Sequence, residues 1–422
     1  MQTLHVSKHK TYNTNGFYQA NKNVLVCGAP GTGKTRGFVI PNLLSNTEDS
    51  FVINDSKGYI FSLYGDYFKE HGYQVVCIDF VHLRGHYNPF DIIKSEYDIL
   101  KTAHMIAYMD AVEGINRDPF WDEESEIALS AFIGFLWEFL PKEKQSLPIL
   151  NDLITNPMDF IPAIDEEVYL LSNQELRLQV ERQFSISRST PSALDRLFLA
   201  VAKQKPDAFC LRQYRKFCTS PEKTFGTIIS ATLSKLGQYD TKEIREFLSK
   251  TDVCFSDIAT KKTAVFICVS DNDRTMDGIA NILYSQIIGY LVIEADKSLP
   301  ERDVDLYFDD FATSVKIPDF PRMIASFRSR RINAFLMIQN ESQLIAMYKE
   351  EAKTIIGSAG TYLYMGNMDI DTIKNVSLRM NIPVGEVIEL PFHNMIVHKQ
   401  GERPFMDECL LLEEYEKEEE ER

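Results

Sequence analysis

Long apolar runs and cysteine motifs are scarce in this chain of 422 residues. The two most apolar helical stretches, residues 127–140 and 279–293, are shorter than the roughly 20 residues that a membrane span needs. No apolar core follows the polar start of the chain, which excludes a signal peptide. The 7 cysteines include no Cys-x-x-Cys pair, so neither a zinc site nor a disulfide framework is indicated. We therefore expect a cytosolic protein that has reduced cysteines and no membrane span.

Positive charge is also in short supply, because 45 Lys and Arg face 61 Asp and Glu, for a net charge of −16. This balance argues against wrapping nucleic acid over an open surface, since phosphate contacts need Lys and Arg. A narrow basic channel inside an acidic assembly stays open as an alternative. Part of the acidic excess lies in residues 413–422, which the pattern predicts to be a solvated tail, although acidic tails also dock basic partners.

What the chain does contain is a short apolar strand, residues 24–27, that runs directly into Gly-x-x-x-x-Gly-Lys-Thr. This pattern is a P-loop. Its glycines let successive N–H groups turn toward a phosphate at a helix N-terminus, while Lys34 reaches the β- and γ-phosphates and the Thr35 hydroxyl ligates Mg²⁺. A glycine-rich turn that binds nothing is the alternative, but strand, loop and Lys-Thr follow in the required order. The predicted nucleotide-binding residues are Gly28, Ala29, Pro30, Gly31, Thr32, Gly33, Lys34, Thr35 and Arg36.

Apolar strand-like runs occupy both ends of the chain, and helical patterns separate several of them. The runs are residues 50–55, 74–79, 264–269, 304–308, 334–338 and 361–365, with 394–398 as a late edge strand. This alternation predicts an α/β fold with a mostly parallel sheet, helices on both faces and ligands at the carboxyl ends of the strands. Two of the runs end on acids, Asp55 and Asp79.

The middle of the chain has a different pattern. Between about residues 94 and 222 strands are scarce, amphipathic helical patterns dominate and prolines separate them. We predict an inserted all-α domain there. The predicted organisation is a nucleotide-binding domain over residues 1–93 and 223–405, the inserted domain over 94–222, and an acidic C-terminal tail over 406–422.

A second acidic element follows the strand-like run 304–308, which ends in Asp309 and Asp310. In P-loop motors the first acid of such a pair holds Mg²⁺ and the second polarises the attacking water. Given the P-loop, we favour these roles for Asp309 and Asp310 over the alternative of two helix-capping acids. Gln339 directly follows the run 334–338, where it is placed to sense the γ-phosphate unless it is a surface amide in a turn.

Three arginines, Arg328, Arg330 and Arg331, lie shortly before that run. They form either a solvated helix face or the source of a guanidinium for a neighbouring subunit's nucleotide. Ring ATPases use such an arginine to stabilise the charge of the transition state.

Taken in order, these motifs resemble the type IV secretion coupling proteins, the conjugative DNA-transfer ATPases of the TraG and TraD type. The resemblance extends over roughly residues 23–381. Its first half rests on the P-loop, residues 39–44 (Val-Ile-Pro-Asn-Leu-Leu), 54–58 (Asn-Asp-Ser-Lys-Gly), 87–91 (Tyr-Asn-Pro-Phe-Asp) and 120–121 (Phe-Trp). Its second half rests on residues 308–312 (Phe-Asp-Asp-Phe-Ala), 317–320 (Ile-Pro-Asp-Phe), 338–344 (Ile-Gln-Asn-Glu-Ser-Gln-Leu) and 354–357 (Thr-Ile-Ile-Gly).

The resemblance implies a homo-hexameric ring of RecA-like P-loop NTPase domains, each bearing an all-helical domain that meets the relaxosome. It implies ATP and Mg²⁺ as cofactors. The implied partners are single-stranded DNA, relaxase and relaxosome proteins, and type IV secretion channel subunits. By this resemblance Lys34, Asp310, Gln339 and Arg328 serve catalysis, the arginine in trans, while Thr35 and Asp309 hold Mg²⁺. The implied location is bacterial cytoplasm, at the inner face of the cell membrane and bound to it through a partner.

Two departures from the family pattern bear on function. Asp310 stands where the family normally places Glu, so its carboxylate is one methylene short and slow hydrolysis is expected. Members usually begin with transmembrane helices, and we expect none here. The leading hypothesis is an ATP-driven translocase for single-stranded DNA or nucleoprotein. The alternative is a docking receptor that binds ATP and hydrolyses little. A small-molecule P-loop kinase is disfavoured, since its substrate pocket would need neither the helical insert nor the arginine-rich segment.

Overall fold

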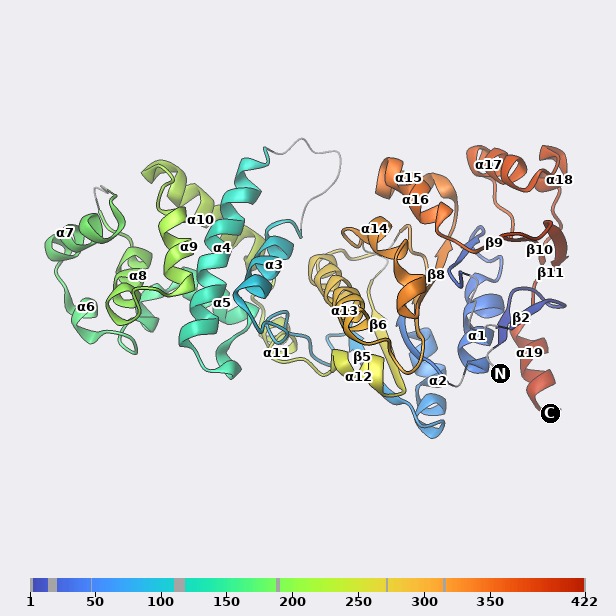
Figure 1. Ribbon diagram of the computed structural model, residues 1–422, viewed down its shortest axis with the longest axis horizontal. Helices are drawn as coiled ribbons and strands as arrows, with labels where there is room; N and C mark the ends of the chain where they lie inside the picture. The colour runs from blue at the N-terminus through green and yellow to red at the C-terminus, as the bar shows by residue number, and fades with distance from the viewer. Residues whose placement is uncertain are drawn as a thin grey trace. The chain divides into compact units, whose positions relative to one another are not determined.

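The computed structural model describes residues 3–13, 21–46, 48–109, 118–186, 190–270, 272–313 and 316–420. It divides into two compact units (Figure 1). One is an α/β unit formed by Met1–Gly85 and Val253–Arg422, and the other is a helical unit formed by His86–Asp252.

The α/β unit contains a nine-stranded sheet with the order β11-β10-β9-β3-β8-β7-β4-β6-β5. Neighbours from β9 to β5 pair in parallel, and β10 and β11 are antiparallel additions at one edge. The central strands β3, β4, β6, β7 and β8 are buried along their whole length, as expected for a parallel sheet covered on both faces. The predicted α/β fold is confirmed. The strands are β3 (Val24–Cys27), β4 (Ser50–Asn54), β5 (Gln74–Asp79), β6 (Thr263–Cys268), β7 (Val304–Phe308), β8 (Ile332–Ile338), β9 (Thr361–Tyr364), β10 (Asn394–Lys399) and β11 (Phe405–Glu408).

The two ends of the chain differ from the sequence-based expectation. The segment expected as a late edge strand is β10, which pairs with β9 on one side and β11 on the other, so β11 forms the edge instead. A hairpin of β1 (Thr3–His5) and β2 (Thr11–Asn13) was not predicted. The segment expected as an acidic tail contains β11 and α19 (Leu412–Glu420), and Leu412 and Tyr415 are buried. Helix α19 packs on α1, and the two lie side by side in Figure 1.

The other helices of the α/β unit connect its strands. They are η1 (Lys34–Val39), α1 (Ile40–Ser45), α2 (Tyr59–Glu70), α12 (Phe255–Thr260), α13 (Asp277–Lys297), α14 (Phe320–Ile324), η4 (Phe327–Arg330), α15 (Glu341–Tyr348), η5 (Lys349–Glu351), α16 (Ala352–Gly357), α17 (Ile370–Met380) and α18 (Val384–Ile388). Helix α13 has 21 residues and is longer than the apolar stretch 279–293, so by length and composition alone it passes as a membrane span. It is the one such helix in the part of the chain that the structure describes, and 61% of its most apolar window is buried, as in the core helix of a globular unit.

The helical unit contains no strand among its described residues. Its helices are α3 (Glu96–Ala107), α4 (Phe120–Phe139), η2 (Lys142–Lys144), α5 (Leu147–Thr155), η3 (Pro157–Phe160), α6 (Glu166–Leu170), α7 (Asn173–Phe184), α8 (Ala193–Gln204), α9 (Phe209–Phe217), α10 (Glu222–Gly237) and α11 (Lys242–Phe247). Its core is aromatic, with the rings of Phe198 and Tyr214 stacked at 3.9 Å. Helix α10 packs on α4 and α5, which is why this unit extends beyond residues 94–222.

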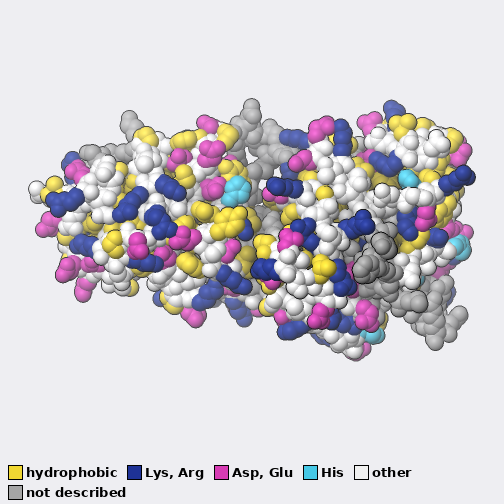
Figure 2. Space-filling model, in the orientation of Figure 1, with side chains coloured by type: hydrophobic (Ala, Val, Ile, Leu, Met, Phe, Trp, Pro, Cys, Tyr) yellow, Lys and Arg dark blue, Asp and Glu magenta, His cyan; other side chains and the backbone are white. Residues whose placement is uncertain are grey.

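Charges of both signs are mixed on the surface. On the face drawn in Figure 2, Lys and Arg side chains lie interspersed with Asp and Glu over both units. Many of the basic side chains are held in ion pairs, as Lys205 is with Glu138 and Arg245 with Asp152.

Candidate nucleotide-binding site

The P-loop joins the carboxyl end of β3 to the helical turn η1, at the edge of the sheet where all parallel strands end. Gly31 and Gly33 have φ angles of 81° and 96°, the left-handed region that favours glycine. The Gly28 N–H donates to the carbonyl of Ile338 (3.0 Å), and the Ala29 N–H donates to the carbonyl of Gly366 (2.8 Å). These two bonds fix the start of the loop to the ends of β8 and β9.

Lys34 is folded into its own loop. Its Nζ donates to the carbonyl oxygens of Gly28 (2.7 Å) and Ala29 (3.2 Å), and the residue is 7% exposed. Burial lowers the pKa of Lys34, while the nearby carboxylates of Asp310 and Asp309 act in the opposite direction. The structure therefore holds the cation inside the loop, where a phosphate can replace the two carbonyls.

Thr35, the residue after Lys34, contacts Asp309. The Thr35 hydroxyl donates to Asp309 Oδ2 at 2.5 Å, and Asp309 follows directly after β7. Burial raises the pKa of Asp309 to about 6, although the Thr35 hydrogen bond favours the charged form. The Asn54 side chain donates to the main-chain carbonyl of Asp309 (2.8 Å) and fixes the backbone there. A hydroxyl and a carboxylate side by side are the oxygen donors that Mg²⁺ prefers, so these residues fit that ion.

Asp310 and Gln339 lie beside this pair. Strand β8 is inserted between β3 and β7, so Gln339, at the end of β8, is placed between the P-loop and the acidic pair. Gln339 Nε2 donates to Asp310 Oδ1 at 3.4 Å. Asp310 has a φ of 52°, an uncommon conformation that aspartate tolerates better than most residues.

These residues line one cavity of about 470 Å³. The predicted residues that it brings together are Pro30, Gly31, Gly33, Lys34, Thr35, Arg36, Asp309, Asp310 and Gln339. Gly28, Ala29 and Thr32 build the loop without lining the cavity.

Arg328 lies elsewhere in the α/β unit. It is an exposed residue of η4, which precedes β8 and so lies at the amino end of that strand, opposite the nucleotide cavity. The two other arginines of the cluster are paired within the unit, Arg330 with Asp296 and Arg331 with Asp303. The structure therefore does not bring Arg328 to the nucleotide cavity of its own chain.

The loop between β4 and α2 contributes a wall that was not among the predicted site residues. Asp55, Ser56, Lys57, Tyr59 and Ile60 line the cavity. Asp55 accepts a hydrogen bond from the Phe61 N–H (2.8 Å) at the start of α2, and burial raises its pKa. The signal was present in the sequence, because Asp55 ends a predicted parallel strand and ligands bind at that edge.

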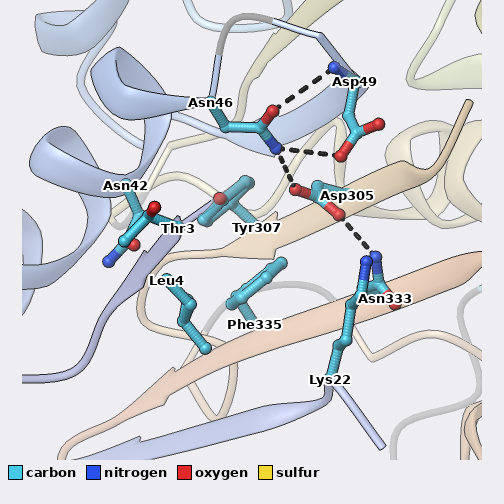
Figure 3. A pocket seen from close by; sticks show the side chains of 10 residues that line it. All are labelled: Thr3, Leu4, Lys22, Asn42, Asn46, Asp49, Asp305, Tyr307, Asn333 and Phe335. Atoms are coloured by element: carbon cyan, nitrogen blue, oxygen red, sulfur yellow. Dashed lines mark hydrogen bonds between the residues drawn. The ribbon is translucent and has the colours of Figure 1, made fainter. Parts of the chain in front are cut away.

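A second cavity, of about 20 Å³, lies near the amino ends of β7 and β8 (Figure 3). There the amides of Asn46 and Asn333 donate to the two carboxylate oxygens of Asp305, at 2.8 and 2.7 Å. Burial and the neighbouring carboxylate of Asp49 raise the pKa of Asp305 to about 8. This cavity has room for about one water molecule, so it is not a nucleotide site.

Comparison with known proteins defines the family. A family model described as "Type IV secretory system Conjugative DNA transfer" matches residues 2–380. The chain belongs to this family. The expected resemblance to conjugative coupling proteins is therefore confirmed. Among curated relatives, Protein VirD4 of Rhizobium radiobacter is 22% identical over 379 residues, which cover 87% of this chain and 48% of VirD4. VirD4 of Agrobacterium fabrum is 22% identical over 384 residues, 87% of this chain and 50% of that protein. The chain spans about half the length of the curated relatives it matches.

Solved structures of a conjugative coupling protein share the fold. The bacterial conjugative coupling protein TrwBdeltaN70 superposes with a TM-score of 0.62 at 15% identity, over 92% of this chain and 85% of that one. TrwB with the non-hydrolysable ATP analogue ADPNP gives 0.60 at 16% identity, over 93% and 86%. TrwB has also been solved with ADP and Mg²⁺, and that structure matches with a TM-score of 0.61 at 16% identity, over 92% and 86%. The expected RecA-like P-loop NTPase fold is confirmed.

Proposed function

We propose that this chain is a Mg²⁺-dependent ATPase that delivers single-stranded DNA, with or without attached relaxase, to a type IV secretion channel. The observation that carries the proposal is the cavity in which Lys34, the Thr35–Asp309 pair and the Asp310–Gln339 pair meet, in a family of conjugative DNA-transfer proteins. Nucleotide complexes of TrwB, which shares the fold, are consistent with ATP and Mg²⁺ as ligands of this cavity.

Binding and chemistry divide among the cavity residues. Lys34 exchanges the carbonyls of Gly28 and Ala29 for the β- and γ-phosphates, and the loop N–H groups bind the β-phosphate. Thr35 and Asp309 hold Mg²⁺, which when bound neutralises negative charge on the phosphates.

Asp310, which follows Asp309 in the chain, is the proton acceptor in the proposed reaction. Asp310 accepts a proton from the water that attacks the γ-phosphorus, and the bond to the β–γ bridging oxygen breaks. Gln339, which donates to Asp310, orients that carboxylate and contacts the γ-phosphate. Arg328 enters the site of the neighbouring subunit in a homo-hexameric ring, where its guanidinium stabilises charge in the transition state.

The proposed DNA path is a channel and not an open face. The net charge of −16 disfavours phosphate binding over an open surface, and the face drawn in Figure 2 mixes charges of both signs. In a ring, a few Lys and Arg from each subunit converge on one axis and bind a single strand. We place the chain in the bacterial cytoplasm at the inner face of the membrane, where relaxosome and channel subunits are its partners.

A docking receptor that binds ATP and hydrolyses little is the second candidate. It is favoured by the short side chain of Asp310, which stands where the family normally places Glu. The two candidates differ in ATP turnover with and without single-stranded DNA. Turnover that DNA stimulates supports the translocase, whereas tight ATP binding with negligible turnover supports the receptor. Failure of the unaltered chain to bind ATP contradicts both.

A further inference from the structure

The acidic C-terminal segment packs on the helical turn that follows the P-loop. The carbonyl oxygen of Leu410 lies so close to Gly37 that a Cβ at that position would collide with it. Only 4% of the surface of each of three residues is exposed: Leu410, Leu412 and Tyr415. Helix α19 also packs on α1. The segment that the sequence presents as a solvated tail is therefore part of the packing around the P-loop helix.

One side chain of α19 reaches a residue of the nucleotide cavity. Arg36, which directly follows Thr35 and lines the cavity, donates from one terminal nitrogen to Glu413 Oε1. Among the described residues the Arg36 guanidinium has no other hydrogen-bond partner. Its other terminal nitrogen and its Nε–H are therefore available to a ligand, and a guanidinium binds phosphate through two such N–H groups.

Helix α19 is anchored independently of Arg36. Glu414 accepts from Lys8 Nζ at 2.9 Å, and the Tyr415 ring packs edge-on against His5 with centroids 5.6 Å apart. Glu416 accepts from the Tyr64 hydroxyl at 3.2 Å. Together with the buried side chains of Leu412 and Tyr415, these contacts hold the helix at several points, so the position of Glu413 does not depend on Arg36 or on any single contact.

We propose that Glu413 is a positioning residue of the nucleotide site, which holds the Arg36 side chain at the cavity wall for contact with nucleotide phosphates. The inference rests on the proposed nucleotide binding. It assigns the acidic segment a role within the chain, in place of a solvated tail. Since both members of the pair are more than half exposed, at 56% and 60%, the effect is small, as for other surface ion pairs.

The test is a double-mutant cycle on nucleotide affinity. We measure the Kd of a fluorescent ADP analogue, and kcat and KM for ATP, in the unaltered chain, Glu413→Gln, Arg36→Ala and the double variant. Glu414→Gln is the matched control, because it removes the same charge from the same helix at a residue that binds Lys8. Glu413→Gln is expected to raise Kd and KM about 2- to 5-fold relative to Glu414→Gln and to leave kcat unchanged. In the Arg36→Ala background the same substitution is expected to change nothing.

Three results overturn the proposal. The first is equal Kd values for Glu413→Gln and Glu414→Gln, and the second is an effect of Glu413→Gln that persists in Arg36→Ala. Either leaves the proposed function intact, because the unaltered chain still binds nucleotide. The third is an unaltered chain that binds no nucleotide, which contradicts the proposed function and the positioning role together.

Discussion

The hydroxyl of Thr35 donates to the carboxylate of Asp309 across 2.5 Å, and the two residues are separated by 274 positions in the chain. One comes from the P-loop and the other from the end of β7, so the contact joins two elements that meet only in the folded sheet. The relationship supports the first prediction, which concerns magnesium.

Thr35→Ala is expected to weaken Mg²⁺-dependent nucleotide binding by about tenfold or more, because one oxygen donor is lost beside a charged partner. The measurement is nucleotide affinity with Mg²⁺ and with EDTA. Affinity in EDTA should be nearly unchanged, and Thr35→Ser, which keeps the hydroxyl, should behave like the unaltered chain. Equal losses in both solutions would contradict the metal assignment. Burial raises the pKa of Asp309 to about 6, and the proposed metal site needs its charged form, so Mg²⁺-dependent affinity should fall as pH drops below that value.

Lys34→Ala is expected to abolish ATP turnover and to weaken nucleotide binding sharply. Of the residues that the structure describes, the two other cations that line the cavity, Arg36 and Lys57, are not hydrogen-bonded inside the loop, so we expect neither to take the place of Lys34 at the γ-phosphate. Turnover and nucleotide affinity are measured together, with circular dichroism as the check on folding. Unchanged turnover in a folded variant would show that the cavity is not the ATPase site.

Asp310→Asn and Arg328→Ala form a complementation test. Asp310→Asn should preserve nucleotide affinity and lower kcat by about 10² to 10⁴, and Arg328→Ala should do the same only in assembled rings. In a mixed ring, an intact Asp310 from one variant faces an intact Arg328 from the other, so part of the turnover should return.

The control for that test is Arg330→Ala. Arg330 is paired with Asp296 in its own chain, so its removal should leave turnover nearly unchanged. If mixed rings form and stay as inactive as either variant, Arg328 has no role in the neighbouring site.

Gln339→Ala is expected to lower kcat about tenfold and to weaken the stimulation of turnover by DNA, because it removes the amide that holds Asp310. ATP turnover is compared with and without single-stranded DNA. Full stimulation in this variant would assign Gln339 to a surface amide without a sensing role.

Asp305→Asn tests the raised pKa of Asp305 in the small polar cavity near the amino ends of β7 and β8. The pKa of Asp305 is raised to about 8 in the folded chain and is near its ordinary value of about 3.9 in the unfolded chain. Between about pH 4 and pH 8 the folded state therefore keeps a proton on Asp305 that the unfolded state has lost. The free energy of unfolding should therefore decrease as pH rises from about 4 to 8, by at most about 1.4 kcal/mol per pH unit from this group. An amide cannot ionise, so Asp305→Asn should flatten that slope.

Urea unfolding at several pH values measures this. Other charged residues lie near Asp305: Asp49 and Asp303 on one side, with Lys22 and Arg331 paired to Asp303. The quantity to compare is therefore the difference in slope between Asp305→Asn and the unaltered chain. Asp66→Asn, at a side chain that is 90% exposed, should keep the slope of the unaltered chain above about pH 5, because Lys69 lowers the pKa of Asp66 and its titration lies below that range. Identical slopes for Asp305→Asn and the unaltered chain would contradict the raised pKa.

The features that the sequence predicts well are local. The P-loop motif is contained in a few consecutive residues, so its spacing predicts the loop that holds Gly31, Gly33 and Lys34. Buried parallel strands are likewise recognisable as short apolar runs. The order of the strands is not local. Nothing in the run 334–338 indicates that β8 lies between β3 and β7, although this is what brings Gln339 to Asp310.

The C-terminal segment shows why the rest was missed. Its many Glu residues give it the composition of a solvated tail, yet Leu412 and Tyr415 are buried against elements made from the start of the chain. Composition averages over the few apolar positions that decide such packing. The wall that includes Asp55 and Ile60 was missed although Asp55 ends a predicted parallel strand, because the strand order that brings this loop to the cavity of Lys34 is not local in the sequence.

The pairing of the two chain ends has a consequence for biosynthesis. Ser7 Oγ donates to Asp407 Oδ2 at 2.6 Å, across a separation of 400 residues. The helix that carries Lys34 and Thr35 therefore emerges from the ribosome long before the segment around Leu410 that packs against Gly37. At about 5 to 20 residues per second, this interval is roughly 20 to 80 s. During that time the nascent P-loop helix lacks the segment that packs against Gly37, so the packing around this helix is completed only after residues 410–416 have been made.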